Sequence, residues 1–171
     1  MQGYIQIYTG NGKGKTTAAF GLSLRAVGAG KKVFFAQFVK GKTYSEIEAV
    51  AQFLPDITIR QYGRGCFIRK DPTQEDIEAA HTGLTEVSEI IQSGRYDMVV
   101  LDEANIALHY QLFTVDQLMD VLRQKPAETE LIVTGRYAPQ ELVDMADLVT
   151  EMKEIKHYYQ SGVQARKGIE F

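Results

Sequence analysis

Apolar runs alternate with helical patterns along the whole chain. Residues 15–28, 73–93, 114–124 and 139–146 are predicted to form helices. Strands that alternate with crossover helices predict an α/β fold, with a mainly parallel sheet covered by helices on both faces. The strands are predicted from six runs rich in β-branched and aromatic residues: YIQIYT (4–9), KVFFAQFV (32–39), ITIRQY (57–62), DMVVLD (97–102), ELIVTG (130–135) and DLVTEM (147–152).

Local signals indicate where several of these helices begin and end. Gly94 stands just after helix 73–93, where a helix commonly stops. Thr114 and Gln117 have the spacing of a capping box. Pro139 occupies a plausible first helical position, since its missing N–H has no partner there in any case.

The composition is that of an ordinary globular protein of 171 residues, 44% hydrophobic and 24% charged. This length predicts a single domain over residues 1–171, because two domains would each have a small core. The net charge of −3 argues against a nucleic-acid-binding protein that acts through a global basic field, although a local basic patch stays possible. A single cysteine, Cys66, excludes an internal disulfide and a cysteine-based zinc site.

No apolar run approaches the length of a membrane span, and a strand-like segment follows Met1 almost at once. We therefore expect a cytoplasmic protein with neither a membrane segment nor a signal peptide.

The segment TGNGKGKTT (9–17) carries the most specific chemical signal. A phosphate-binding loop follows the pattern G-x-x-x-x-G-K-[ST], but the first glycine of that pattern would fall at position 9, where the chain has threonine. Glycines between a strand and a helix let backbone N–H groups surround an anion at the positive end of the helix. In such a loop Lys15 reaches the outer phosphate oxygens and the Thr16 hydroxyl binds Mg²⁺. The segment predicts a nucleotide site in a P-loop NTPase (RecA-like) architecture, formed by Thr9, Gly10, Asn11, Gly12, Lys13, Gly14, Lys15, Thr16 and Thr17.

Two carboxylates, Asp102 and Glu103, follow the apolar strand 97–102. They fall at the carboxyl edge of a parallel sheet, where the loop also opens and where ligands bind in such folds. A carboxylate at this edge can hold Mg²⁺ directly or through water. Both are therefore candidate metal ligands, and which of them touches the ion stays open.

Arg136 follows another strand and reaches the same edge if the sheet is parallel. It is a candidate to pair with phosphate or with an acidic partner, and a surface arginine in a turn is the alternative. His81, His109 and His157 show no metal-ligand spacing and are interpreted as surface or structural residues.

The region 39–72 is the least regular part of the chain, and YGRGCFIRK (62–70) within it is interpreted as an ordered, functional loop. Cations flank its apolar tip, which would suit a flat apolar ligand with acidic side groups. A loop that tucks Phe67 into the core explains the pattern equally well. The tail KHYYQSGVQARKGIEF (156–171) either folds over a ligand or is a loose end.

Four segments together resemble the P-loop family of ATP:corrinoid adenosyltransferases: GNGKGKTTAAFGLSLRAVGAGKKVFFAQFVKG, DMVVLDE, LIVTGR and LVTEMKEIKHYYQSGVQARKGIEF. The resemblance covers nearly the whole chain and is most specific in the shifted loop, in QFVKG and in GVQARKGIEF. It implies transfer of the 5′-deoxyadenosyl group of ATP to the reduced cobalt of cob(I)alamin or another corrinoid, with release of triphosphate. It also implies a cytoplasmic enzyme that uses Mg²⁺ or Mn²⁺, receives electrons from a reductase and forms a homodimer.

The resemblance also implies roles for individual residues. The family holds ATP with its triphosphate reversed in the loop, and a loop one residue tighter is compatible with that. Cobalt(I) is then the nucleophile, so that no general base is needed and the protein must stabilise the departing triphosphate. Lys15 and Glu103 are the expected catalytic residues. Phe67 and Ile68 are expected at the lower face of the corrinoid, where family members carry GFTW-like residues and this chain has GRGCFI.

Two other functions stay open. The first is a P-loop kinase, since DEAN (102–105) is similar to the DEAQ of type II thymidine kinases, although one cysteine cannot supply the four-cysteine zinc lobe of that group. The second is a regulatory module that binds ATP without catalysis. Release of ADP instead of triphosphate would identify the kinase, and tight ATP binding with no adenosylated product would identify the module.

Overall fold

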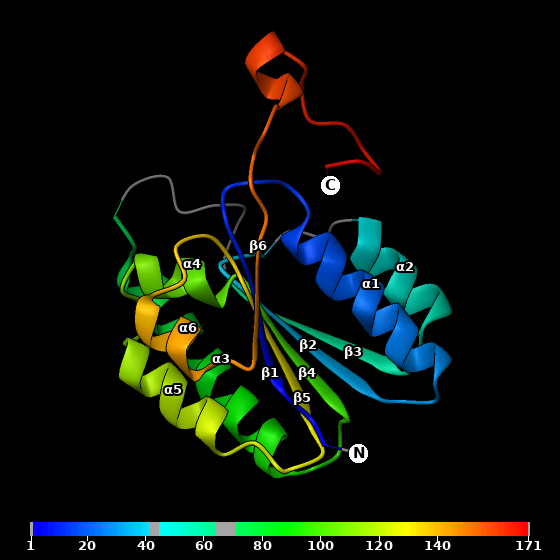
Figure 1. Cartoon of the computed structure of the whole chain (residues 1–171), viewed down its shortest axis with the longest axis vertical. Coiled ribbons are helices and arrows are strands. Elements are labelled where there is room, and N and C mark those ends of the chain that lie inside the picture. Colours follow the sequence, from blue (N-terminus) through cyan, green and yellow to red (C-terminus); the bar gives the residue numbers. More distant parts are fainter. Residues whose placement is uncertain (1, 42–44, 64–70, 171) are drawn as a thin grey trace.

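Six parallel strands form one sheet in the computed structural model, which describes residues 2–41, 45–63 and 71–170 (Figure 1). The sheet has the order β3-β2-β4-β5-β1-β6. Every predicted strand is present, so the prediction of a parallel α/β sheet is confirmed. The strands are β1 (Ile5–Thr9), β2 (Val33–Phe38), β3 (Ile57–Tyr62), β4 (Met98–Asp102), β5 (Glu130–Thr134) and β6 (Leu148–Glu151).

Helices cover both faces of this sheet (Figure 1). One face carries α1 (Lys15–Gly28) and α2 (Ser45–Phe53). The opposite face carries α3 (Gln74–Gln92), α4 (Ala104–His109), α5 (Val115–Arg123) and α6 (Gln140–Met145). A short 3₁₀ helix, η1 (Tyr158–Ser161), lies in the tail beyond the carboxyl edge of the sheet. In the part of the chain that the structure describes, no helix combines the length and apolarity of a membrane span.

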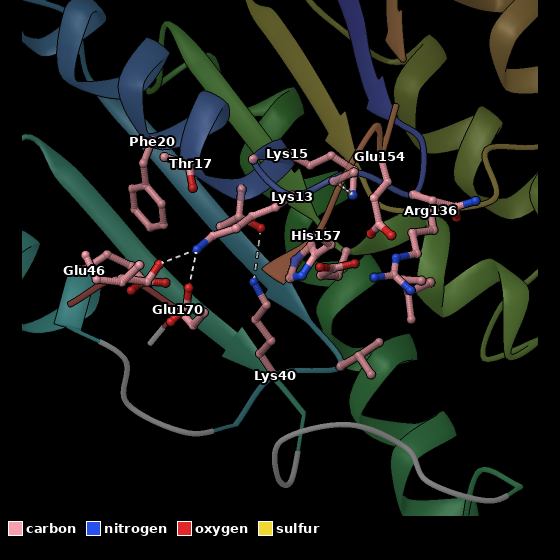
Figure 2. Close-up of a pocket in the computed structure, with 18 of the residues that line it drawn as sticks. Lys13, Lys15, Thr17, Phe20, Lys40, Glu46, Arg136, Glu154, His157 and Glu170 are labelled. Carbon is pink, nitrogen blue, oxygen red and sulfur yellow. Dashed lines mark hydrogen bonds and ion pairs between the residues drawn. The ribbon is translucent and has the colours of Figure 1, made fainter. Parts of the chain in front are cut away.

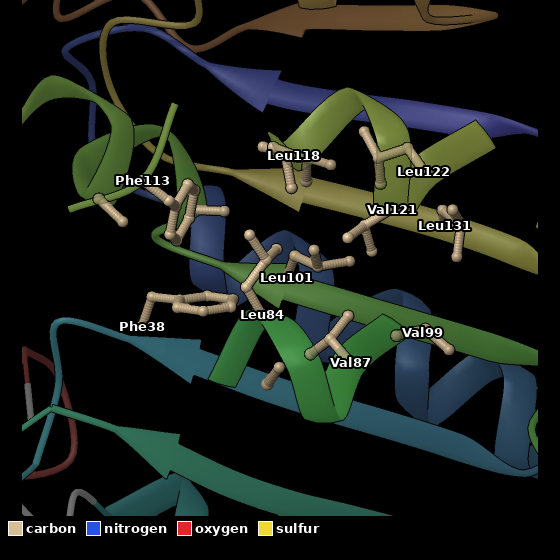
Figure 3. Close-up of a cluster of buried hydrophobic side chains, with 14 of the residues drawn as sticks. Phe38, Leu84, Val87, Val99, Leu101, Phe113, Leu118, Val121, Leu122 and Leu131 are labelled. Carbon is tan, nitrogen blue, oxygen red and sulfur yellow. The ribbon is translucent and has the colours of Figure 1, made fainter. Parts of the chain in front are cut away.

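The hydrophobic core is divided between the two faces of the sheet. The larger cluster lies where α3 and α5 pack on the strands, and its members include Leu84, Val87, Val99, Leu101, Leu118, Leu122 and Leu131 (Figure 3). The smaller cluster lies under α1 and α2 and includes Ala19, Phe35, Val50, Val100 and Ile132. Because both faces are covered, β2 and β4 are buried along their whole length, as their largely apolar sequences indicate.

The predicted helix signals are largely confirmed. The Thr114 hydroxyl accepts the Gln117 N–H at 3.2 Å, and the Gln117 side chain accepts the Thr114 N–H at 2.8 Å. Gly94 lies two residues after the end of α3 and has a φ of 61°, the left-handed conformation that commonly follows a helix. Pro139 differs slightly from the prediction, because it caps α6 with an extended ψ of 153° and the helix begins at Gln140.

Two short helices, α2 and α4, have no counterpart among the predicted elements. α2 has nine residues, lies in the region predicted to be irregular and buries only Val50. α4 has six residues and follows β4 directly after Glu103, whose φ is 59°. Helices this short contain too few apolar repeats for their period to be recognised in a sequence.

The packing of α3 against β3 makes a stability prediction. A Cβ at Gly83 would lie 2.5 Å from Cγ and 2.8 Å from Cβ of Tyr62, and the Cβ of Tyr62 cannot move without the backbone. We expect Gly83→Ala to destabilise the protein by about 1–3 kcal/mol through overpacking, measured as the free energy of unfolding in urea.

Gly21→Ala is the matched control, because Gly21 is an exposed position of α1 where an added Cβ meets nothing within 4 Å. Here the higher helix propensity of alanine should stabilise the protein by about 0.5–1 kcal/mol. Effects of the same sign in both variants would contradict the packing described.

Candidate nucleotide-binding and catalytic site

The first glycine of the loop stands at position 10, and the residue at position 9 still belongs to the preceding strand. Thr9 is still part of β1 and pairs with Glu151 of β6. The turn starts at Gly10, which has a φ of 94°, and a Cβ there would lie 2.5 Å from the carbonyl oxygen of Met152. Gly12 is fixed to the same carbonyl, to which its N–H donates at 2.6 Å. The chain therefore requires glycine at position 10 and not at position 9.

Lys15, the first residue of α1, folds back over this loop. Its Nζ donates to the carbonyl oxygens of Gly10 at 2.8 Å and Gly12 at 2.7 Å, and the residue is only 8% exposed. Burial lowers the pKa of Lys15, Glu103 opposes that shift and Arg136 adds to it. In these two bonds the ammonium meets neutral carbonyls, so its charge is available to an anion in the loop.

The carboxylate of Asp102 is the centre of a hydrogen-bond network at the carboxyl edge of the sheet. Asp102 is fully buried, and its Oδ1 accepts hydrogen bonds from the hydroxyls of Thr16 at 2.8 Å and Thr134 at 2.7 Å. Its Oδ2 accepts from Lys40 Nζ at 2.8 Å and from Gln37 Nε2 at 3.2 Å. The four donors lie in α1, at the end of β5, in β2 and in the segment after β2. One carboxylate therefore connects four parts of the chain.

Glu103 has a different environment from its neighbour. It adopts a left-handed conformation, its N–H donates to the Thr134 hydroxyl at 3.0 Å, and it lines the cavity described below. Burial raises the pKa of Glu103, the Asp102 charge raises it further, and Lys40, Lys15 and Arg136 lower it. Among the described residues, no group of three or more His, Cys, Asp or Glu side chains could hold a metal ion by itself.

A cavity of about 760 Å³ opens between the loop, the strand ends and the tail (Figure 2). Lys13, Lys15, Lys40 and Arg136 line it, and so do four carboxylates, those of Glu46, Glu103, Glu154 and Glu170. Thr9, Gly10 and Asp102 are not among the residues that line it, and Phe67 and Ile68 fall outside the described residues. The predicted site residues that line it are Asn11, Gly12, Lys13, Gly14, Lys15, Thr16, Thr17, Glu103 and Arg136.

Other residues line the cavity although the sequence did not single them out as site residues: Phe20, Lys40, Glu46, His109, Tyr137, Glu154, His157 and Glu170. The ring of His109 lies 4.4 Å from that of Tyr137, so two aromatic rings face one side of the cavity. His109 and His157 are thus part of the cavity wall and not merely surface positions. For Lys40 a signal exists in the sequence, since it directly follows the predicted strand 32–39 at the edge where ligands bind.

The tail folds back onto the loop through Lys13 (Figure 2). Lys13 Nζ donates to the Tyr158 hydroxyl at 3.1 Å, to the Ile169 carbonyl at 2.9 Å and to Glu170 Oε1 at 2.8 Å. The hydrogen bonds from Lys13, Tyr158 and Arg166, in that order, hold the pKa of Glu170 well below its usual range. Of the two interpretations of the tail, the structure favours a segment that closes over the site.

A strand, a glycine-rich loop and a helix that begins at Lys15, with a buried aspartate two strands away, define a P-loop nucleotide-binding α/β protein. The chain belongs to the family ATP:corrinoid adenosyltransferase BtuR/CobO/CobP, whose family model matches residues 1–171. The expected membership of that family is confirmed.

Curated relatives agree with this assignment. The chain is 35% identical to a corrinoid adenosyltransferase of Pseudomonas aeruginosa over 171 residues, which cover 99% of this chain and 84% of that protein. It is 37% identical to a corrinoid adenosyltransferase of a Sinorhizobium species over 173 residues, covering 99% and 81%. It is 33% identical to the corrinoid adenosyltransferase of Escherichia coli strain K12 over 170 residues, covering 99% and 86%.

The raised pKa of Glu103 predicts a pH dependence of stability. In the unfolded chain Glu103 loses its proton near the ordinary pKa of 4.5, whereas in the folded protein it keeps the proton to a higher pH. The free energy of unfolding therefore falls as pH rises from 4.5 through the pKa of the folded state. Glutamine does not titrate, so Glu103→Gln removes this fall in the free energy of unfolding. We expect the free energy of unfolding of the variant, measured in urea without metal, to exceed that of the wild type by an amount that grows as pH rises from about 4 to 7.

Glu89→Gln, at an exposed position of α3, controls for the removal of one negative charge. A difference between Glu103→Gln and the wild type that stays constant with pH, or that matches the Glu89→Gln variant, would contradict the environment assigned to Glu103.

Proposed function

We propose that this protein transfers the 5′-deoxyadenosyl group of ATP to the cobalt(I) of a corrinoid and releases triphosphate. One observation carries this assignment: the loop amides and the side chains of Lys13, Lys15, Lys40 and Arg136 meet at one cavity. Such a concentration of donors suits a ligand with several negative charges. Family membership supplies the reaction type, because the matching family is that of ATP:corrinoid adenosyltransferases.

In the reaction proposed, the cobalt(I) electron pair forms a bond to the ribose C5′ while the bond between C5′ and the triphosphate oxygen breaks. Negative charge then grows on the triphosphate, and no proton has to move. The tasks of the protein are to align cobalt with C5′ and to stabilise the leaving group. Lys15 and the loop N–H groups would serve the second task and Arg136 would assist, as would Lys13 once it leaves its three acceptors in the tail.

Magnesium or manganese fits beside this leaving group. The Thr16 hydroxyl and the Asp102 carboxylate lie 2.8 Å apart and offer the oxygen ligands that Mg²⁺ prefers. Their contact favours Asp102 over Glu103 as the closer carboxylate, with Glu103 placed to act through water or on the substrate. When bound, the ion would neutralise part of the charge that develops on the triphosphate.

The remaining assignments extend this proposal. We assign Phe67 and Ile68 to the lower face of the corrinoid, and the His109 and Tyr137 rings offer an aromatic wall to a flat ligand. The protein is proposed to act in the cytoplasm as a single domain within a homodimer, with a reductase as electron donor. Neither nucleic acid nor a membrane is a proposed partner.

The direct test is anaerobic incubation with ATP, Mg²⁺ and chemically reduced cobalamin. We expect the visible spectrum to change to that of a light-sensitive cobalt–carbon product. Tight ATP binding without this product would instead indicate a regulatory module, and the proposal would fail.

Lys15 should be essential to turnover. Lys15→Ala removes a donor to the departing triphosphate and should lower the rate by about 10²–10³ or more, with circular dichroism and the urea midpoint showing an intact fold. Lys31→Ala is the matched control, since Lys31 is a partly exposed lysine that forms an ion pair with Asp97 at 3.5 Å. Turnover near the wild-type rate in Lys15→Ala would refute the role of the loop.

Phe67 should contribute to corrinoid binding. Phe67→Ala is expected to weaken the apparent corrinoid affinity by about tenfold, the scale of one lost aromatic contact, with a smaller effect on the KM for ATP. Phe53→Ala serves as control because Phe53 is 67% exposed on α2. Unchanged corrinoid affinity and rate in Phe67→Ala would count against this assignment.

A further inference from the structure

Lys40 is held in its position by an unusual backbone conformation. Val39, the residue between β2 and Lys40, has a φ of 62°. A β-branched residue rarely adopts this left-handed conformation, and such strain collects at functional sites. The conformation turns the chain at the end of β2, and the Lys40 side chain reaches Asp102, with only 13% of its surface exposed.

The ammonium of Lys40 touches the same two groups that are proposed to hold the metal. Its Nζ lies 2.8 Å from Asp102 Oδ2 and 3.2 Å from the Thr16 hydroxyl oxygen. The other carboxylate oxygen, Oδ1, is already bonded to the Thr16 and Thr134 hydroxyls. A metal ion that binds Asp102 directly, or through an ordered water, must therefore compete with Lys40 for Oδ2.

Two cations do not share this position at low cost. Mg²⁺ takes its ligands at about 2.0–2.1 Å in a nearly octahedral shell, and its charge would repel an ammonium held on the same carboxylate. Without any cation, however, Asp102 would be a fully buried carboxylate balanced only by neutral donors, which is strongly unfavourable.

We propose that Lys40 is a resident counter-ion, which neutralises Asp102 before the metal arrives and which the metal then displaces into the cavity. This inference rests on the metal site of the proposed function. Lys40 already lines the cavity, and the four-carbon stem of a lysine lets its head group swing from the carboxylate toward the phosphates. Binding of ATP with its metal would thus move one positive charge onto the leaving group. Lys40 is a positioning residue in the metal-free protein and a phosphate-binding residue in the loaded one.

The test compares wild type, Lys40→Met and Lys40→Arg at one pH. Mn²⁺ binding is measured by the EPR signal of the free ion, first without ATP and then with it, and Tm is recorded in EDTA and at saturating Mn²⁺. Lys40→Met should bind Mn²⁺ without ATP about tenfold more tightly than wild type, within the usual size of linked binding effects. Its Tm should fall in EDTA and recover with Mn²⁺. Lys40→Arg keeps the competing charge and should bind Mn²⁺ about as weakly as wild type.

A purely structural ion pair gives a different result. Equal Mn²⁺ affinity in all three proteins, with a Tm deficit of Lys40→Met that Mn²⁺ does not repair, would overturn the inference and leave the metal site standing. Absence of Mn²⁺ binding in every protein, with and without ATP, would overturn the metal site and this inference together.

A measurement on the wild type alone covers the case in which Lys40→Met does not fold. Lysines are acylated with an amine-reactive ester in EDTA and in Mn²⁺, both without ATP, and modified positions are quantified by mass spectrometry. Mn²⁺ should increase the acylation of Lys40 several-fold while that of Lys31 stays constant. Acylation of Lys40 that Mn²⁺ leaves unchanged would overturn the displacement.

Discussion

The buried carboxylate of Asp102 is the charge on which the rest of the site depends. Removing a carboxylate from water costs several kcal/mol, so its hydrogen-bond donors must stay in place whenever it is ionised. Those donors are Thr16, Thr134, Gln37 and Lys40. One side chain thereby fixes the start of α1, and with it the phosphate-binding loop, to the ends of β2 and β5.

The parallel sheet explains why so much chemistry meets at one edge. In a parallel sheet every strand delivers its following segment to the same side, so β1 brings the loop, β2 brings Lys40, β4 brings Asp102 and Glu103, and β5 brings Arg136. The convergence requires strained backbone conformations just after several strands. Val39, Glu103 and Tyr137 adopt left-handed conformations just after β2, β4 and β5, with φ of 62°, 59° and 62°.

The strands and the loop could be predicted from the sequence because their signals are local. Apolar runs identify the buried strands, and the glycines with Lys15 and Thr16 identify the loop. The pairing of Asp102 with Lys40 could not be predicted, because a lysine after an apolar strand looks like a solvated strand end until the conformation of Val39 is known. The contact of Lys13 with Glu170 spans 157 positions, and nothing local in the tail reports it.

Adenosyl transfer and phosphoryl transfer differ in which bond to the triphosphate breaks, and the role proposed for the cavity is to stabilise three linked phosphates as one leaving group. The most direct measurement is ³¹P NMR of the phosphate products after turnover with ATP and a reduced corrinoid. The expected result is one equivalent of triphosphate for each adenosylated corrinoid, with no ADP. Formation of ADP and orthophosphate, with no nucleoside attached to cobalt, would contradict the function assigned to this fold.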